Sequence, residues 1–148
     1  MIPDLDADGN LPPGVHPATW AELEARCGSN PHRRLLLSGL RRAAEVFRVA
    51  GCKTIFVDGS FVTRKDVPSD FDGCWERAGM SLLTLQAADP VLLIFDNGRA
   101  AQKAKYYGEL FPADMVEGGS GMTFLNFFQR DKDTGRAKGI LALDLGSL

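Results

Sequence analysis

The pattern of apolar and polar residues predicts two helices in the first third of the chain. In the segment from Pro17 to Gly28, residues Trp20, Leu23 and Cys27 follow an i, i+3, i+7 spacing, which is typical of one buried helical face. Proline suits the first turn of a helix and glycine suits its end. We therefore expect a short helix over this segment.

The second predicted helix begins at Asn30-Pro31 and ends at Gly51. Asparagine is a preferred N-cap and proline a preferred first helical residue. The apolar positions i, i+4, i+7 and i+11 form one core stripe, made of Leu36, Leu40, Ala43 and Phe47. This segment is the longest helix that the pattern predicts.

The second helix is also rich in arginine. Its only acidic residue is Glu45, and its five arginines are Arg33, Arg34, Arg41, Arg42 and Arg48. One interpretation is a solvated face on which Glu45 pairs with arginines three or four residues away. The other is a local basic surface for RNA phosphates or for an acidic protein partner.

Two strands are predicted in the middle of the chain. Thr54–Asp58 is β-branched and aromatic, follows a helix and ends at the Gly59-Ser60 turn. A polar connection leads to the turn residues Pro68-Ser69, and Asp70–Trp75 follows as the second strand. The pattern therefore predicts strand, turn, polar connection and strand.

The pattern in the second half of the chain is less regular. It first predicts a short helix over residues 80–88, then a strand or buried helical turn at Pro90–Phe95, and then a turn or N-cap at 96–98 before a helix over Arg99–Leu110. A third strand is predicted at Pro112–Glu117. The chain breaks at Gly118–Gly121, where Ser120 could cap a helix over 122–129, with a strand there as the alternative; a turn at 133–136 and a last strand at Lys138–Leu145 follow.

The length and composition fit one domain. The chain has 148 residues, 45% of them hydrophobic and 24% charged, which are ordinary globular values. Residues 1–15, which are rich in proline and glycine, are expected to form an irregular arm, and residues 16–148 the domain. We predict an α/β (α+β) fold in which helices flank a mixed central sheet.

Charge, hydropathy and cysteine content exclude several classes of protein. A formal net charge of −2 gives no bulk attraction to nucleic acid or to an anionic membrane. No apolar run approaches the roughly 20 residues that a transmembrane helix needs, and the acidic N-terminus does not resemble a signal peptide. Three cysteines without C-x-x-C spacing indicate neither a disulfide framework nor a zinc site. We expect a cytoplasmic protein.

The candidate chemistry lies between Thr54 and Trp75. Asp70 and Asp72 are two residues apart in a predicted strand, so both side chains point to the same face. Adjacent carboxylates repel each other unless a cation neutralises them, and this favours a divalent metal site. The backbone N–H groups and hydroxyl of the Gly59-Ser60 turn suit a phosphate. The alternative is structural: cap or turn acids and an ordinary turn serine.

The two motifs together resemble those of a known family. Gly-Ser at the end of a strand, followed after about ten residues by Asp-Phe-Asp in a second strand, is similar to the signature of the nucleotidyltransferase superfamily, which has the DNA polymerase beta-like fold. The resemblance covers about the middle third of the chain, Thr54–Trp75, and a predicted third strand. It implies a single minimal nucleotidyltransferase domain.

The resemblance also implies roles for individual residues. Gly59 and Ser60 would bind the triphosphate, and Asp70 and Asp72 would bind two Mg²⁺ ions, with Mn²⁺ as an alternative. A third acid from a neighbouring strand would complete the site; Asp114 is the first choice, with Glu117 and Asp96 as alternatives. The basic residues predicted to offset the negative charge of the triphosphate are Arg64 and Lys65, with Lys103 and Lys105 as alternatives.

The activity implied is Mg²⁺-dependent transfer of a nucleoside monophosphate from an NTP to an RNA, protein or small-molecule acceptor. The detailed form of the motifs resembles small stand-alone bacterial members of toxin–antitoxin and defence systems, which implies a toxin with a cognate antitoxin protein as partner. The alternative is a catalytically degenerate nucleotidyltransferase fold that binds protein or RNA.

Overall fold

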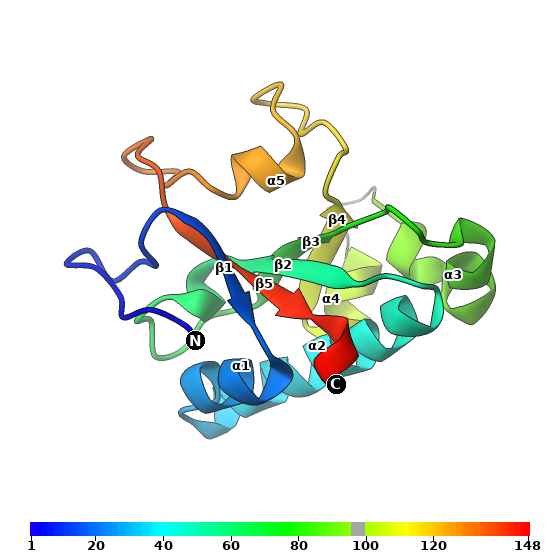
Figure 1. The fold of residues 1–148 in the computed structure, drawn as a ribbon, viewed down its shortest axis with the longest axis horizontal. Coiled ribbons are helices and arrows are strands. Elements are labelled where there is room, and N and C mark those ends of the chain that lie inside the picture. Colours follow the sequence, from blue (N-terminus) through cyan, green and yellow to red (C-terminus); the bar gives the residue numbers. More distant parts are fainter. Residues whose placement is uncertain (96–99) are drawn as a thin grey trace.

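The computed structural model describes residues 1–95 and 100–148, and the predicted turn or cap at 96–98 lies outside them. Its centre is a mixed five-stranded sheet in the order β1-β5-β2-β3-β4 (Figure 1). The strands are β1 (Gly14–Ala18), β2 (Thr54–Asp58), β3 (Phe71–Trp75), β4 (Gly108–Pro112) and β5 (Gly139–Asp144). β2 pairs antiparallel with β3 and β5, whereas β1–β5 and β3–β4 are parallel pairs. The predicted α+β class is confirmed.

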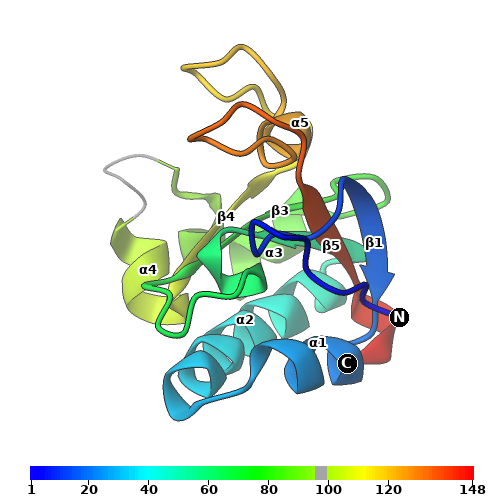
Figure 2. The ribbon, with the colours of Figure 1, turned by 90° about the vertical axis from the view of Figure 1, so that its left-hand side faces the viewer.

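Helices cover the two faces of the sheet unequally. The helices are α1 (Trp20–Cys27), α2 (Pro31–Val49), α3 (Leu82–Ala88), α4 (Ala100–Tyr106) and α5 (Phe124–Phe127), and short 3₁₀ turns are η1 (Ser60–Val62), η2 (Pro90–Leu93) and η4 (Leu145–Ser147). Figures 1 and 2 show α1, α2 and α4 on one side of the sheet and the short α5 on the other. The face beneath α5 is therefore only partly covered by helix.

Helix α2 provides the main support of the sheet. Its N-cap Asn30 accepts a hydrogen bond from the Arg33 backbone N–H at 2.8 Å, and Pro31 is its first residue, as predicted. The predicted stripe is fully buried, and the Phe47 ring lies 5.2 Å from the ring of Trp75 on β3. Burial of such side chains stabilises a fold by about 1.5–3 kcal/mol each, so this contact fixes α2 against the sheet.

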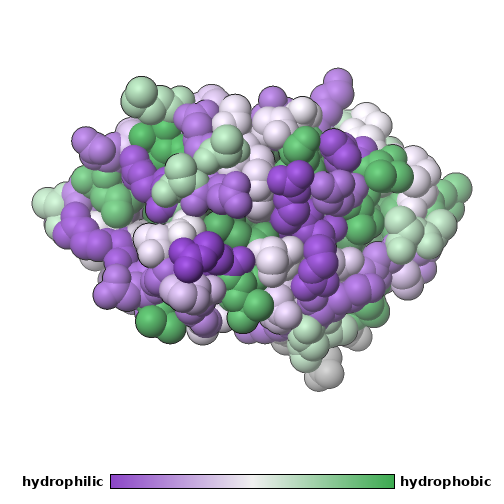
Figure 3. All heavy atoms as spheres, turned by 90° about the horizontal axis from the view of Figure 1, so that it is seen from below, coloured by the Kyte–Doolittle hydropathy of each residue, from purple (hydrophilic) through white to green (hydrophobic). Residues whose placement is uncertain are grey.

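The outer surface of α2 carries ion pairs. Glu45 pairs with Arg41 and with Arg48, both at 3.1 Å, as the solvated-face interpretation predicts. Figure 3 shows the side of α1 and α2, where hydrophilic side chains lie among apolar ones. Arg33, by contrast, is only 4% exposed and belongs to the interior.

The opposite face of the sheet has its own smaller apolar cluster. Cys74, Phe111 and Ile140 project from the strands and are covered by Phe124 and Phe128. The rings of Phe111 and Phe124 stack at 4.0 Å between centroids. This cluster fills one end of the face and leaves the other end, where β2 finishes and β3 begins, to polar side chains.

The predicted N-terminal elements are wrong at their boundaries. Pro17 lies in edge strand β1, where a missing N–H is tolerated, and not in a helix. Helix α1 begins only at Trp20, because Thr19 and Glu22 form a capping box. The N-terminal segment is irregular before β1, but its Ile2 and Leu11 side chains are buried in the core.

The predicted strand at Pro112–Glu117 is also wrong, as is the helix through Leu110. Helix α4 ends at Tyr106, and Tyr107 adopts a left-handed conformation with φ 68°. The chain enters β4 at once and leaves it at Pro112. The left-handed Tyr107 ends the helix before the predicted Leu110, so the strand lies before Pro112 and not after it.

Other predictions of the second half are confirmed with small shifts. Helix α3 is the short helix predicted over residues 80–88. Pro90–Leu93 forms a helical turn and not a strand, and β5 is the predicted last strand. Helix α5 is capped by Thr123 and not by Ser120. Over the two described ranges, no helix combines the length and hydropathy that crossing a bilayer requires.

Candidate active site

Three carboxylates meet at the open end of the sheet face. Asp70, Asp72 and Glu109 each offer an oxygen, and these oxygens all lie within 4.8 Å of one another. Asp72 and Glu109 are direct partners in the parallel register of β3 and β4, and Asp70 immediately precedes β3. Residues two apart on a strand share a face, so the pairing of β3 with β4 brings the acids together.

A fourth acid extends the row to β2. Asp58 is the antiparallel partner of Asp72, so neighbouring acids stand on three adjacent strands. Its carboxylate is buried and its Oδ1 lies 3.2 Å from Lys138 Nζ, an ion pair without hydrogen-bond geometry. Burial raises the pKa of Asp58, and Lys138 and the Gly59 backbone oppose this. Asp58 therefore lies beside the acidic cluster.

The pKa of Asp72 reflects the crowding of negative charge in the cluster. Burial raises the pKa of Asp72 from 3.8 to about 7, and repulsion by Asp70, Glu109 and Asp58 adds to this effect. Lys103 acts in the opposite direction but does not cancel it. An additional cation at this point would therefore be stabilising.

Lys103 is the basic residue that reaches the cluster. Its Nζ lies 2.8 Å from Glu109 Oε1 and 3.4 Å from Asp70 Oδ2. The hydrogen bond to Glu109 raises the pKa of Lys103, with further help from the charge of Asp70. Because the Lys103 side chain is 46% exposed, it can leave the carboxylates without opening the core.

The other predicted cations lie elsewhere. The Arg64 guanidinium donates to the Asp6 carbonyl at 3.3 Å, on the N-terminal segment. Lys105 pairs with Asp89 at 2.7 Å. Lys65 is exposed on the same loop as Arg64, and the structure gives it no contact with the cluster within the described residues. Of the four cations named from the sequence, only Lys103 contacts the acids.

Asp114 is not part of the cluster. It follows the end of β4 and pairs with Arg77 at 2.6 Å. Glu109 lies near the start of β4, whereas Asp114 lies beyond its last residue, Pro112. The third acid beside Asp70 and Asp72 is Glu109. Glu109 could have been found from the sequence as an acid within the apolar run Gly108–Phe111. It was missed because this run was assigned to a helix that continued through Leu110.

The alternatives to Asp114 do not reach the cluster either. The Glu117 carboxylate accepts hydrogen bonds from the backbone N–H groups of Gly119 and Ser120, at 2.9 and 2.7 Å. Asp96 lies outside the described residues.

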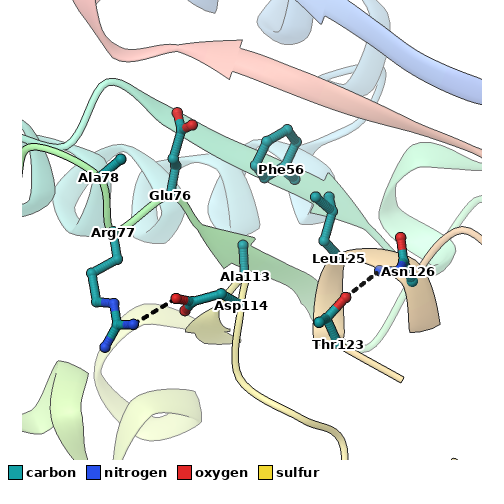
Figure 4. Close-up of a pocket in the computed structure, with 9 residues that line it drawn as sticks. All are labelled: Phe56, Glu76, Arg77, Ala78, Ala113, Asp114, Thr123, Leu125 and Asn126. Atoms are coloured by element: carbon teal, nitrogen blue, oxygen red, sulfur yellow. Dashed lines mark hydrogen bonds and ion pairs between the residues drawn. The ribbon is translucent and has the colours of Figure 1, made fainter. Parts of the chain in front are cut away.

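Asp114 lines a separate cleft of about 530 Å³ at the far end of β3. In Figure 4 the Arg77–Asp114 pair lies on one side of the cleft and Thr123 with Asn126 on the other. Phe56 and Leu125 form its apolar part. Phe56 precedes Asp58 by two residues on β2, so the cleft and the acids share one face of the sheet.

The turn after β2 lies directly against the acids. Gly59 has φ +85°, and a Cβ at this position would lie 2.7 Å from Asp72 Oδ2. Only glycine combines that conformation with such a close approach. Ser60 begins η1, and the role of its hydroxyl stays a prediction.

The donor set of the cluster fits magnesium. Mg²⁺ prefers oxygen ligands, and its protein sites are built from carboxylates and water. Asp70, Asp72 and Glu109 supply such oxygens, and the side chains of Asp70 and Asp72 are only partly buried.

The fold and site together define an α+β protein whose mixed sheet carries an acidic cluster at one end of one face. The chain belongs to the family DUF6932, described as a family of unknown function, which matches residues 3–144. No curated protein and no solved structure is significantly similar to it.

Proposed function

We propose that this protein is a Mg²⁺-dependent nucleotidyltransferase that moves a nucleoside monophosphate from an NTP to an acceptor hydroxyl. The observation that supports the proposal is the cluster of Asp70, Asp72 and Glu109 on adjacent strands, with the Gly59 turn packed against Asp72. Phosphoryl transfer needs little beyond positioning and neutralisation of charge, and this arrangement can supply both.

In this proposal each group has a defined role. Asp70, Asp72 and Glu109 would hold the metal, which would supply charge neutralisation at the phosphates and activation of the acceptor oxygen. The acceptor oxygen forms a bond to the α-phosphorus, the bond to pyrophosphate breaks, and the hydroxyl proton passes to a carboxylate of the cluster. Lys103, released from Asp70 and Glu109 once they are neutralised, is free to contact the pyrophosphate. The Gly59 turn places backbone donors beside the triphosphate.

The proposed acceptor is an RNA, a protein or a small molecule. Membership of a toxin–antitoxin pair, with a cognate antitoxin as partner, is part of the same proposal and rests on the resemblance of the two motifs. The cleft containing Phe56 and Asp114 is open on the same face of the sheet and is a reasonable place for part of the acceptor.

A degenerate binding module is the second candidate. One observation favours it: Lys103 already neutralises Asp70 and Glu109 without a metal. A protein that had lost its chemistry could retain the fold by such an internal ion pair.

Transfer of label from each α-labelled NTP distinguishes the two candidates. The protein is incubated with Mg²⁺ and, in separate reactions, total RNA or lysate protein. We expect transfer by the parent and none by Asp70→Asn/Asp72→Asn. Asp133→Asn is the matched control, since it removes an exposed acid that lies outside both the cluster and the cleft, and it should transfer normally.

Calorimetric titration with Mg²⁺ and NTP separates binding from transfer. If Asp70→Asn/Asp72→Asn binds NTP as tightly as the parent does, the site assignment is wrong. Persistent absence of transfer by the parent, with retained binding of RNA or protein, would favour the module.

A further inference from the structure

The loop between β2 and β3 connects the two halves of the proposed site. It leaves the Gly59 turn, passes through η1 and reaches Asp70 without forming a strand. In Figures 1 and 2 this stretch runs beside the N-terminal half of α2. The distance between the turn and the acids therefore depends on what holds the loop.

The buried guanidinium of Arg33 binds most of this loop. Arg33 Nη1 donates to the Phe61 carbonyl at 2.5 Å, and Nη2 donates to the Thr63 carbonyl at 2.9 Å. Nη2 also donates to the Lys65 carbonyl, and Nη1 contacts the Cys27 carbonyl at 3.4 Å. Three alternate carbonyls of one loop thus converge on a single side chain.

The N-cap of α2 and a residue of its first turn also bind carbonyls of this loop. Asn30 Nδ2 donates to the Asp66 carbonyl at 2.7 Å, and His32 Nε2 contacts the Pro68 carbonyl. The first turn of α2 therefore binds the loop from Phe61 to Pro68 through its backbone, independently of the loop's side chains.

Packing alone does not explain why the charged side chain of Arg33 is buried. It is 4% exposed, and within the described residues every partner of its guanidinium is a backbone carbonyl or the Phe61 ring. Burying a charge without a carboxylate partner is costly, and an apolar side chain would pack the same space at lower cost. The rigid fork of five N–H donors is what the loop carbonyls use.

We propose that Arg33 is a positioning residue of the active site. By fixing the carbonyls of residues 61, 63 and 65, it fixes the Gly59 turn relative to Asp70 and Asp72. This inference rests on the proposed function and adds a residue that touches neither metal nor nucleotide. It also replaces the expectation that Arg33 belongs to a basic surface for partners.

The test compares Arg33→Lys and Arg33→Ala with Arg34→Met. Arg34 is the adjacent arginine, exposed, with one hydrogen bond to the Gly28 carbonyl, and its replacement should change nothing. Lysine keeps the charge but cannot span the three carbonyls. Hydrogen exchange is read over residues 60–70 and over the core strands, and Mg²⁺ and NTP affinities are measured in parallel.

We expect amides of residues 60–70 in Arg33→Lys to exchange at least about tenfold faster, with the core strands unchanged, because several hydrogen bonds are lost locally. NTP affinity should fall about tenfold or more, and Mg²⁺ affinity by less than about twofold, because β3 and β4 are intact. Ethylguanidinium at millimolar concentration should restore slow loop exchange to Arg33→Ala, and it should have no effect on Arg34→Met, in which loop exchange is already slow.

Two results would overturn the inference: unchanged loop exchange in both Arg33 variants, or exchange that accelerates equally in the loop and the core. If the parent binds no NTP, the proposed function fails, whereas the exchange comparison still reports whether Arg33 positions the loop.

Discussion

Replacing Asp72 by asparagine tests the electrostatics of the acidic cluster directly. Asparagine has nearly the same shape as a protonated aspartate, so Asp72→Asn fixes the neutral form. The pKa of Asp72 is raised from 3.8 to about 7, chiefly by burial and then by Asp70, Glu109 and Asp58. The ionised form is therefore disfavoured in the folded protein without metal.

The sign and size of the effect follow from this pKa. Between about pH 4 and pH 7 the folded state holds a proton that the unfolded chain has lost, so the free energy of unfolding falls as the pH rises. The difference between 3.8 and about 7 corresponds to an upper bound of about 4 kcal/mol. Asp72→Asn should thus be more stable than the parent at pH 8, by about 1–4 kcal/mol, and the advantage should disappear toward pH 4.

Urea denaturation with EDTA at several pH values measures this difference, and repeating it with Mg²⁺ tests the metal site. Mg²⁺ at 100 times its dissociation constant should stabilise the parent by about 2.7 kcal/mol, and Asp72→Asn much less. Binding should release part of a proton at pH 6.5, which calorimetry in two buffers detects. A variant that is less stable than the parent at every pH, or equal stabilisation of both proteins by Mg²⁺, would refute the reasoning.

Three further predictions concern single residues. Lys103→Met removes the internal cation of Asp70 and Glu109, so Mg²⁺ should bind more tightly by calorimetry while thermal stability in EDTA falls; weaker Mg²⁺ binding would contradict this. Gly59→Ala should lower Mg²⁺ affinity at least about tenfold because its Cβ would displace the Asp72 carboxylate, whereas Gly79→Ala, with a similar φ of +79° but open space, should only lose stability. Gly39→Ala should reduce the free energy of unfolding in urea by about 2 kcal/mol or more, since a Cβ there would lie 1.9 Å from the Tyr106 carbonyl, and an unchanged midpoint would contradict the packing of α2 on α4.

The sequence by itself determined the elements with a local physical cause. The apolar stripe of α2, its Asn30 cap and Pro31 start, and the strand Thr54–Asp58 were all predicted and are all present. Capping and side-chain periodicity depend on residues within a few positions of one another, and so they can be read from a single chain. The spacing of Asp70 and Asp72 predicted their common face for the same reason.

Only the tertiary structure decided which residues join that pair. Glu109 is 37 positions from Asp72 and meets it because β4 pairs in parallel with β3 in one register, which starts after the left-handed Tyr107. Asp114 satisfied the same local criterion and lies with Arg77 at the other end. Arg33 looked like part of a charged face, but the loop that folds back over α2 buries it. Register and loop closure are non-local, so no pattern along the chain specifies them.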